Sequence, residues 1–202
     1  MRFMSATQLS EKDEIRAFIA RRVAEGFDSE EEIVEEAIGY FSEELGESDE
    51  LNSLVEELAC ELLEAHQESE QSWQGDTDCD RLDRAFSELE ENGIVARQNF
   101  TCCQTCGHAE IWEEIEQAKQ EERETKPSGY VFYHMQDTER AVEDGALYLA
   151  YGAVDNSDDM AIKTAQKISE ILRRNGLDVS WNGSLDKRLL VENMTWRRRR
   201  CS

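Results

Sequence analysis

The stretch GYVFYHMQDTERAVEDGALYLAYG, residues 129–152, contains the pattern that decides the fold. Its segments 130–134 and 147–151 are short runs of aromatic and aliphatic residues, which favour buried β-strands. A polar segment that begins at Asp137 lies between them and predicts a short helix. Strand, helix and strand therefore follow one another, as expected for a sheet covered by helices.

The same alternation continues on both sides of this stretch. A strand is predicted at 94–100, and helices are predicted around 111–118 and 160–174. The chain then predicts a hairpin, with strands at 177–181 and 188–191 joined by a loop that contains Asn-Gly. Because strands separated by helices tend to be parallel, we expect a mixed, mostly parallel sheet of about five strands with a C-terminal hairpin.

The N-terminal third of the chain has a different pattern. Its apolar residues recur at helical spacing in three segments, while glutamates fill the opposite faces. Ser10 and Ser29 are each followed three residues later by a carboxylate, which is the spacing of a capping box at a helix start. We therefore predict an α+β protein, with an acidic helical bundle at 1–72 followed by an α/β-type domain at 73–202.

The charge of the chain is strongly negative and unevenly distributed. The 202 residues carry a net charge of −24, and residues 1–100 hold 28 acidic but only 8 basic side chains. Such a field repels nucleic acid, and it suits either solubility alone or association with a basic protein. We expect a basic protein partner and no nucleic-acid partner, while a solvated surface without any partner remains the simpler interpretation.

The sequence predicts neither a membrane segment nor a secretory signal peptide. No apolar run is long enough to cross a bilayer, and the first 14 residues lack the apolar core of a signal peptide. We therefore expect a cytoplasmic protein without a membrane partner. In that reducing compartment its six cysteines are expected to be free thiols or metal ligands instead of disulfides.

Three of these cysteines, Cys102, Cys103 and Cys106, form a cysteine cluster in the sequence CCQTCGH. Cys103 and Cys106 have the C-x-x-C spacing at which two thiolates can bind one tetrahedral zinc ion. A zinc site would take its two further ligands from the set Cys102, Cys79, His108 and His134. Two alternatives remain open: a redox pair whose thiol pKa is lowered at a helix start, and ordinary reduced thiols.

Parallel strands would also bring three segments to one edge of the sheet. If the first three strands are parallel, the segments 102–108, 134–138 and 151–155 all follow strand ends at that edge, where open sheets bind ligands. His134 and Asp137 are then the candidates for acid–base catalysis. The alternative is that Asp137 caps a helix and His134 only ends a strand.

Several segments resemble a bacterial domain family of unknown function. They are DRLD at 80–83, GIVAR at 93–97, GYVFYH at 129–134, LYLAYG at 147–152 and WNG at 181–183. The resemblance covers about residues 73–196 and implies no activity.

The sequence contains no complete catalytic signature. It lacks a G-x-S-x-G elbow, a Walker loop, a G-x-G-x-x-G motif, an H-E-x-x-H motif and an EF-hand loop. Our leading hypothesis is therefore a non-enzymatic acidic module for protein interaction or regulation, comparable to an immunity protein or antitoxin. The alternative hypothesis is a small zinc-binding or thiol-dependent enzyme with its site at the C-terminal edge of the sheet.

Overall fold

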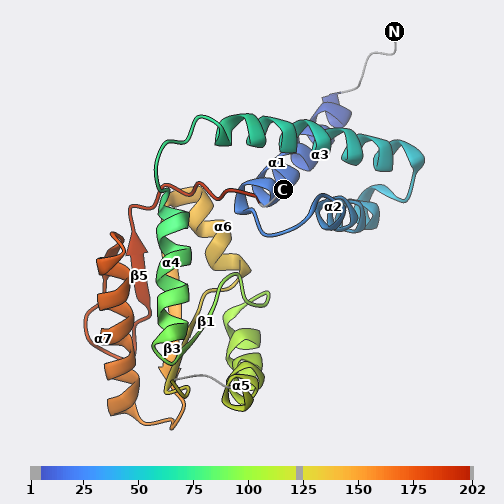
Figure 1. Ribbon diagram of the computed structural model, residues 1–202. Helices are drawn as coiled ribbons and strands as arrows, with labels where there is room; N and C mark the ends of the chain where they lie inside the picture. The colour runs from blue at the N-terminus through green and yellow to red at the C-terminus, as the bar shows by residue number, and fades with distance from the viewer. Residues whose placement is uncertain (1–5, 122–124, 201–202) are drawn as a thin grey trace. The chain divides into compact units, whose positions relative to one another are not determined.

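The computed structural model describes residues 6–121 and 125–200, which form seven helices and five strands (Figure 1). The chain divides into two compact units. The first, called the helical unit here, contains the residues up to Gly75 together with the segment from Arg197. The second, the sheet unit, is Asp76–Trp196. The expected α+β class, with helices followed by a five-stranded mixed sheet, is confirmed.

The helical unit consists of α1 (Ala6–Glu25), α2 (Glu30–Leu45) and α3 (Asp49–Glu70). Ser29 forms the predicted capping box at the start of α2. The start expected at Ser10 is wrong, because α1 already begins at Ala6 and serine is tolerated inside a helix. The Ser10 side chain lies outside the described residues.

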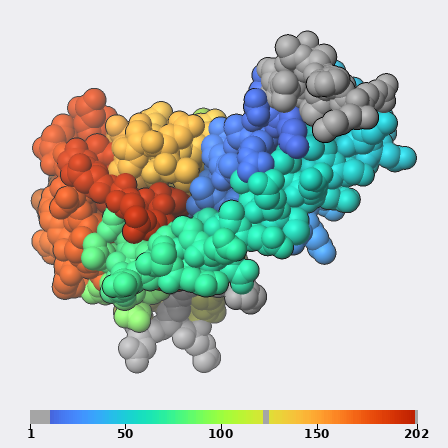
Figure 2. Space-filling view, turned by 90° about the horizontal axis from the view of Figure 1, so that it is seen from above, coloured from blue at the N-terminus to red at the C-terminus, as the bar shows by residue number. Residues whose placement is uncertain are grey.

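The apolar stripes of the three helices form one core. Ile19, Ile33 and Val55, one from each helix, are completely buried there. The C-terminal segment packs on the same unit: the Arg198 guanidinium lies 4.4 Å from the Phe27 ring centre. The backbone N–H of Arg200 donates to Glu70, and Figure 2 shows this segment in red beside the residues that follow α3. Part of the C-terminal arginine run therefore completes the helical unit.

The sheet unit contains four helices and five strands. Its helices are α4 (Asp78–Glu91), α5 (Gln104–Gln120), α6 (Met135–Asp144) and α7 (Asp158–Arg174). Its strands are β1 (Ile94–Arg97), β2 (Gly129–Phe132), β3 (Leu147–Ala153), β4 (Asp178–Ser180) and β5 (Leu189–Glu192), in the spatial order β1-β2-β3-β5-β4. The predicted C-terminal hairpin is present as the antiparallel pair β4 and β5.

The expectation of a mostly parallel sheet is wrong. Among the described strands, only β1 and β2 pair in parallel, whereas the β2–β3, β3–β5 and β5–β4 pairs are antiparallel. The reason lies in α6, whose buried residues are Asp137, Thr138 and Ala141, so that only one of them is apolar. A helix with so narrow an apolar stripe cannot cover a sheet face as a crossover helix does. The chain turns at Gly145, which has a φ of 74°, and returns as β3 beside β2.

The two faces of the sheet are covered by different helices. Tyr130 and Phe132 pack with Ile111 of α5. Gly129 lies against Thr164 of α7, where an added Cβ would come within 2.5 Å of the threonine methyl group. Because alternate residues of a strand point to opposite faces, α5 and α7 lie on opposite sides of the sheet.

Candidate functional site

The loops that follow β1 and β2 meet at the carboxyl edge of these two strands. The N–H of Phe100 donates to the carbonyl of Tyr133 at 2.8 Å, and the Thr138 hydroxyl donates to the Asn99 side chain at 2.7 Å. Two of the three segments expected at this edge are therefore brought together. The third, 151–155, is not, because β3 runs antiparallel to β2 and its end emerges at the opposite edge.

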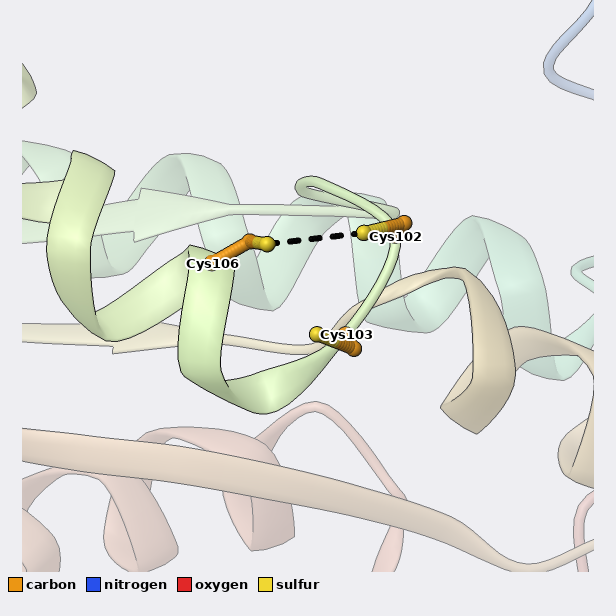
Figure 3. Close-up of side chains that lie close together, drawn as sticks. All are labelled: Cys102, Cys103 and Cys106. Atoms are coloured by element: carbon orange, nitrogen blue, oxygen red, sulfur yellow. Dashed lines mark hydrogen bonds between the residues drawn. The ribbon is translucent and has the colours of Figure 1, made fainter.

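The cysteine cluster lies at this edge, where α5 begins (Figure 3). The Sγ atoms of Cys102 and Cys106 are 3.5 Å apart, and all three Sγ atoms lie within 4.8 Å of one another. Cys102 is exposed, and Cys103 and Cys106 are partly exposed. The arrangement places three thiols on one accessible turn, so they can hold a metal ion.

The start of α5 makes the cluster thiols unequal. Backbone N–H groups of Cys106 and Thr105, together with the Cys106 thiol, lower the pKa of Cys103. The neighbouring Cys102 and Cys103 thiols raise the pKa of Cys106 to about 11. Cys103, the N-cap residue, therefore becomes a thiolate most readily, as expected at the positive end of a helix dipole.

The residue that precedes the cluster has an unusual backbone. Thr101 has a φ of 61°, in the left-handed region that β-branched residues rarely adopt. Its carbonyl accepts a hydrogen bond from the N–H of Met135 at 3.1 Å, and its hydroxyl donates to the carbonyl of Cys103 at 3.2 Å. Surrounding contacts therefore hold this strained turn in place, and with it the position of the cysteines.

The other predicted zinc ligands lie elsewhere in the sheet unit. Cys79 is buried in α4 with 1% of its surface exposed, and neither His108 nor His134 belongs to the group of sulfurs. The Nδ1 atom of His108 lies 3.4 Å from the Tyr130 hydroxyl. The sixth cysteine, Cys201, lies outside the described residues. The structure thus brings together three of the six residues proposed as metal ligands.

The predicted acid–base pair, His134 and Asp137, is also brought together, but inside the protein. His134 is the N-cap of α6 and forms a capping box with Asp137, and both residues are buried. The Asp137 carboxylate lies 3.0 Å from His134 Nε2 and 2.9 Å from Arg188 Nη1. Its hydrogen bonds are therefore directed at neighbouring groups of the protein itself.

Burial shifts the pKa of both residues of this pair toward the neutral form. It lowers the pKa of His134, although the Asp137 charge acts in the opposite direction. It raises the pKa of Asp137, although Arg188 and His134 oppose this shift. The pKa values of both groups are therefore shifted, as they often are in catalytic sites, but the contacts of the pair are mainly those of a helix cap.

A groove of about 360 Å³ lies beside this pair and was not foreseen from the sequence. It is lined by side chains of α5, β2 and the loop before β5, among them His108, Tyr130, Lys187 and Arg188. The sequence pattern indicated that Tyr130 was a core residue and that Arg188 only began a strand. Nothing local marked Arg188 as a site residue, because its partner Asp137 is 51 positions away.

The fold and the site define a two-unit α+β protein with an exposed cysteine cluster at the edge of a mixed sheet. The family model described as domain of unknown function DUF6891 matches residues 8–200, so the chain belongs to this family. The match confirms the resemblance noted from the sequence and extends it over the helical unit. No curated protein and no solved structure matches the chain. Within the described part of the chain, no helix combines the length and hydropathy needed to span a membrane.

Proposed function

We propose that this protein is a cytoplasmic zinc-binding module whose cysteine cluster holds one zinc ion per chain. The observation that carries the proposal is the convergence of three Sγ atoms within 4.8 Å of one another. Tetrahedral Zn–S bonds of about 2.3 Å place sulfur atoms about 3.8 Å apart. The Cys102 and Cys106 sulfurs are already 3.5 Å apart, so small side-chain rotations suffice to form the site.

The thiol ligands of the cluster favour binding of a soft metal ion over a hard one. Thiolates select zinc over magnesium or calcium, which prefer oxygen ligands. The lowered pKa of Cys103 favours the thiolate form that a metal requires. The start of α5 adds the partial positive charge of its N–H groups, which offsets part of the repulsion between three thiolates.

Such a site would have one open coordination position. In the described part of the chain, no fourth histidine, cysteine or carboxylate belongs to the group of three cysteines. Structural zinc sites use four protein ligands, whereas sites with three retain a position for water or a ligand from another molecule. The zinc ion would therefore be accessible for exchange or for bridging to a partner.

Elemental analysis tests the zinc proposal directly. Protein purified without chelator, or reconstituted with excess zinc and desalted, should contain about one zinc per chain. Cys103→Ser and Cys106→Ser should each abolish binding, because two thiolates in an exposed turn hold zinc weakly. Cys60→Ser is the matched control, since Cys60 is exposed on α3 and remote in sequence from the cluster. A wild-type zinc content far below one, with three freely titrating thiols, would rule out the site.

Cobalt substitution adds a spectroscopic test of the ligand set. Cobalt(II) bound by thiolates should give a charge-transfer band that Cys60→Ser retains and Cys102→Ser loses, because Cys102→Ser also leaves only two thiolates. An unchanged band in Cys102→Ser would leave only the C-x-x-C pair as ligands. In that case the three-cysteine site would be wrong.

A role in protein interaction is a second proposal, favoured by the helical unit. This unit already accommodates arginines: Arg200 donates to the carbonyl of Val23, and the Arg199 guanidinium lies 5.9 Å from the Trp73 ring centre. Its many glutamates would attract a basic partner in the way that immunity proteins and antitoxins attract basic enzymes. We propose such a regulatory, non-enzymatic partnership, in which association is fast and weakened by salt.

Charge-neutralising variants test this partnership. Affinity capture at low salt should return a specific basic protein, and its association rate should fall in a variant with Glu43, Glu44 and Glu47 changed to Gln. These three residues are exposed at the end of α2 and the loop after it. A matched control changes the exposed Glu113 and Glu116 on α5 to Gln. Absence of a specific partner, or equal rates in both variants, would contradict the proposal.

A further inference from the structure

The groove in the sheet unit has the features of a binding site that does not depend on the cysteine cluster. We propose that it binds a small organic anion, through a carboxylate or phosphate group held by Arg188, Lys187 and His108. The groove, of about 360 Å³, is large enough for such a molecule. It lies over β3 and the loop before β5, and Gln104 and His108 of α5 line its other side, while none of the three cysteines lines it.

Arg188 provides the main argument, because its guanidinium is fixed and only partly used. Its Nη1 donates to both Asp137 oxygens, at 3.0 and 2.9 Å. Its carbon Cζ lies 4.9 Å from the centre of the Tyr148 ring, which supports the guanidinium from one face. Its Nε and Nη2 donate to no group among the described residues. This free Nε–Nη2 edge matches two oxygens of a carboxylate or phosphate.

His108 and Lys187 provide further donors in the same groove. The His108 ring packs edge-on against Phe132, with the centres 5.2 Å apart, and its Nδ1 contacts the Tyr130 hydroxyl. Neither His108 Nε2 nor Lys187 Nζ has a hydrogen-bond partner in the described part of the chain.

The floor of the groove is shaped by a close approach of two strands. Gly152 lies opposite Tyr130, and an added Cβ would come within 2.5 Å of the tyrosine ring. The glycine therefore lets the Tyr130 ring lie flat over β3, with its hydroxyl at the groove. A ligand can then contact the sheet backbone on one side and the aromatic ring on the other.

Two carboxylates also line the groove, and a local contact stabilises the charged form of each. Asp186 accepts a hydrogen bond from the Ser184 hydroxyl, which lowers the pKa of this carboxyl. Asp158 lies in the first turn of α7, where the helix dipole compensates its charge. In a chain with a net charge of −24, the groove still brings together two cations, Arg188 and Lys187, and the His108 ring as a third hydrogen-bond donor.

Titration of the full chain with succinate and with inorganic phosphate tests the proposal, with sodium chloride at equal ionic strength as the reference. Saturable shifts of the His108 ring and Arg188 side-chain NMR signals are expected for at least one probe, and the stronger probe identifies the preferred group. Arg188→Lys keeps the positive charge but removes the pair of guanidinium N–H donors, Nε and Nη2, that would bind two ligand oxygens. It should therefore weaken binding about tenfold. Lys187→Ala should weaken binding severalfold.

Controls separate a built site from general charge attraction. Lys163→Ala removes an exposed lysine on α7 that does not line the groove, and it should leave the affinity unchanged. Lys187→Ala provides a second variant in case Arg188→Lys folds poorly, because the Lys187 ammonium group is exposed and has no hydrogen-bond partner in the described structure, while the backbone hydrogen bonds of Lys187 are retained. Absence of saturable shifts with both probes, or equal affinity in wild type, Arg188→Lys and Lys187→Ala, would overturn the proposal.

Discussion

Two helices, α5 and α6, begin side by side at one edge of the sheet, and their first turns use polar groups differently. In α6 the N-cap His134 and Asp137 bind each other and are buried. In α5 the thiol of the N-cap Cys103 makes no side-chain capping hydrogen bond, although the nearby N–H groups favour its thiolate form, and the surrounding thiols are accessible. Both turns follow strands of the same parallel pair, so the difference lies in the side chains and not in the position.

The comparison teaches that position at a sheet edge does not by itself make a residue functional. The reactive groups of α6 are satisfied by a capping box and by Arg188, so they stabilise the fold. The thiols of α5 contribute little to capping and remain available to a ligand. Loss of side chains should therefore affect stability at α6 and binding at α5.

The largest effect is expected for Asp137→Ala. This change leaves Arg188 without its carboxylate and removes one half of the α6 capping box. We expect the free energy of unfolding to fall by about 2–4 kcal/mol, measured by urea denaturation. Metal-free Cys103→Ser, at the equivalent turn of α5, should change it by less than about 1 kcal/mol. Equal losses in the two variants would contradict the comparison.

Gly107→Ala should have the next largest effect, because it disturbs the packing of α5 against the sheet. An added Cβ would lie 2.3 Å from Cε2 of the buried Phe132 ring. Overpacking of this kind costs about 1–3 kcal/mol, which exceeds the gain in helix propensity of about 1 kcal/mol. The matched control is Gly39→Ala in α2, where nothing lies within 4 Å and stability should rise. Zinc affinity should fall only in Gly107→Ala.

The fold was predictable where it depends on neighbouring residues. The capping box at Ser29 and the helical stripes of the first unit follow from spacing alone, and the structure contains them. The direction of β3 was not predictable in this way, because it depends on how α6 packs. A helix between two strands suggested a crossover, but α6 has only Ala141 as a buried apolar residue.

The site was predictable to the same local extent. The C-x-x-C spacing places Cys103 and Cys106 on one helical turn, and Cys102 precedes them directly, so their convergence follows from local geometry. Cys79 is separated from the cluster by β1, and its burial in the core could not be read from spacing. Arg188 joins Asp137 only through the pairing of β5 with β3, which no local pattern encodes.

The pH dependence of stability should also distinguish the first turn of α6 from that of α5, although this effect is smaller than those of Asp137→Ala and Gly107→Ala. Burial lowers the pKa of His134 below the unfolded value of about 6.5, so the unfolded chain binds more protons as the pH falls through this value. The free energy of unfolding should therefore decrease below about pH 6.5. His134→Asn keeps a capping acceptor but removes this titration. Asp137 lies 3.0 Å from His134 and their pKa values depend on each other, so the difference between the two proteins reports the titration of this pair.

Urea denaturation of both proteins between about pH 7 and pH 5 measures this difference. Wild type should lose stability relative to His134→Asn as the pH falls. A constant difference over this range would show that the His134 pKa is the same in the folded and unfolded states.

The smallest effect concerns thiol reactivity and changes no fold stability. The N–H groups at the start of α5 lower the pKa of Cys103, whereas the pKa of Cys106 is raised to about 11 and that of Cys60 is raised by Glu64. At about pH 7.5, iodoacetamide should alkylate Cys103 at least about tenfold faster than Cys106 or Cys60, because only the thiolate reacts. Peptide mapping by mass spectrometry gives the three rates.

Two conditions test whether this order arises from the helix start. Denaturation in urea removes the N–H groups of α5 from Cys103, so the three rates should become similar. Zinc should protect Cys103 and Cys106 together while leaving Cys60 unprotected, since Cys60 lies on α3. Faster alkylation of Cys106 in the native protein would mean that the α5 turn does not activate its N-cap thiol. The contrast with the satisfied capping box of α6 would then have no chemical consequence.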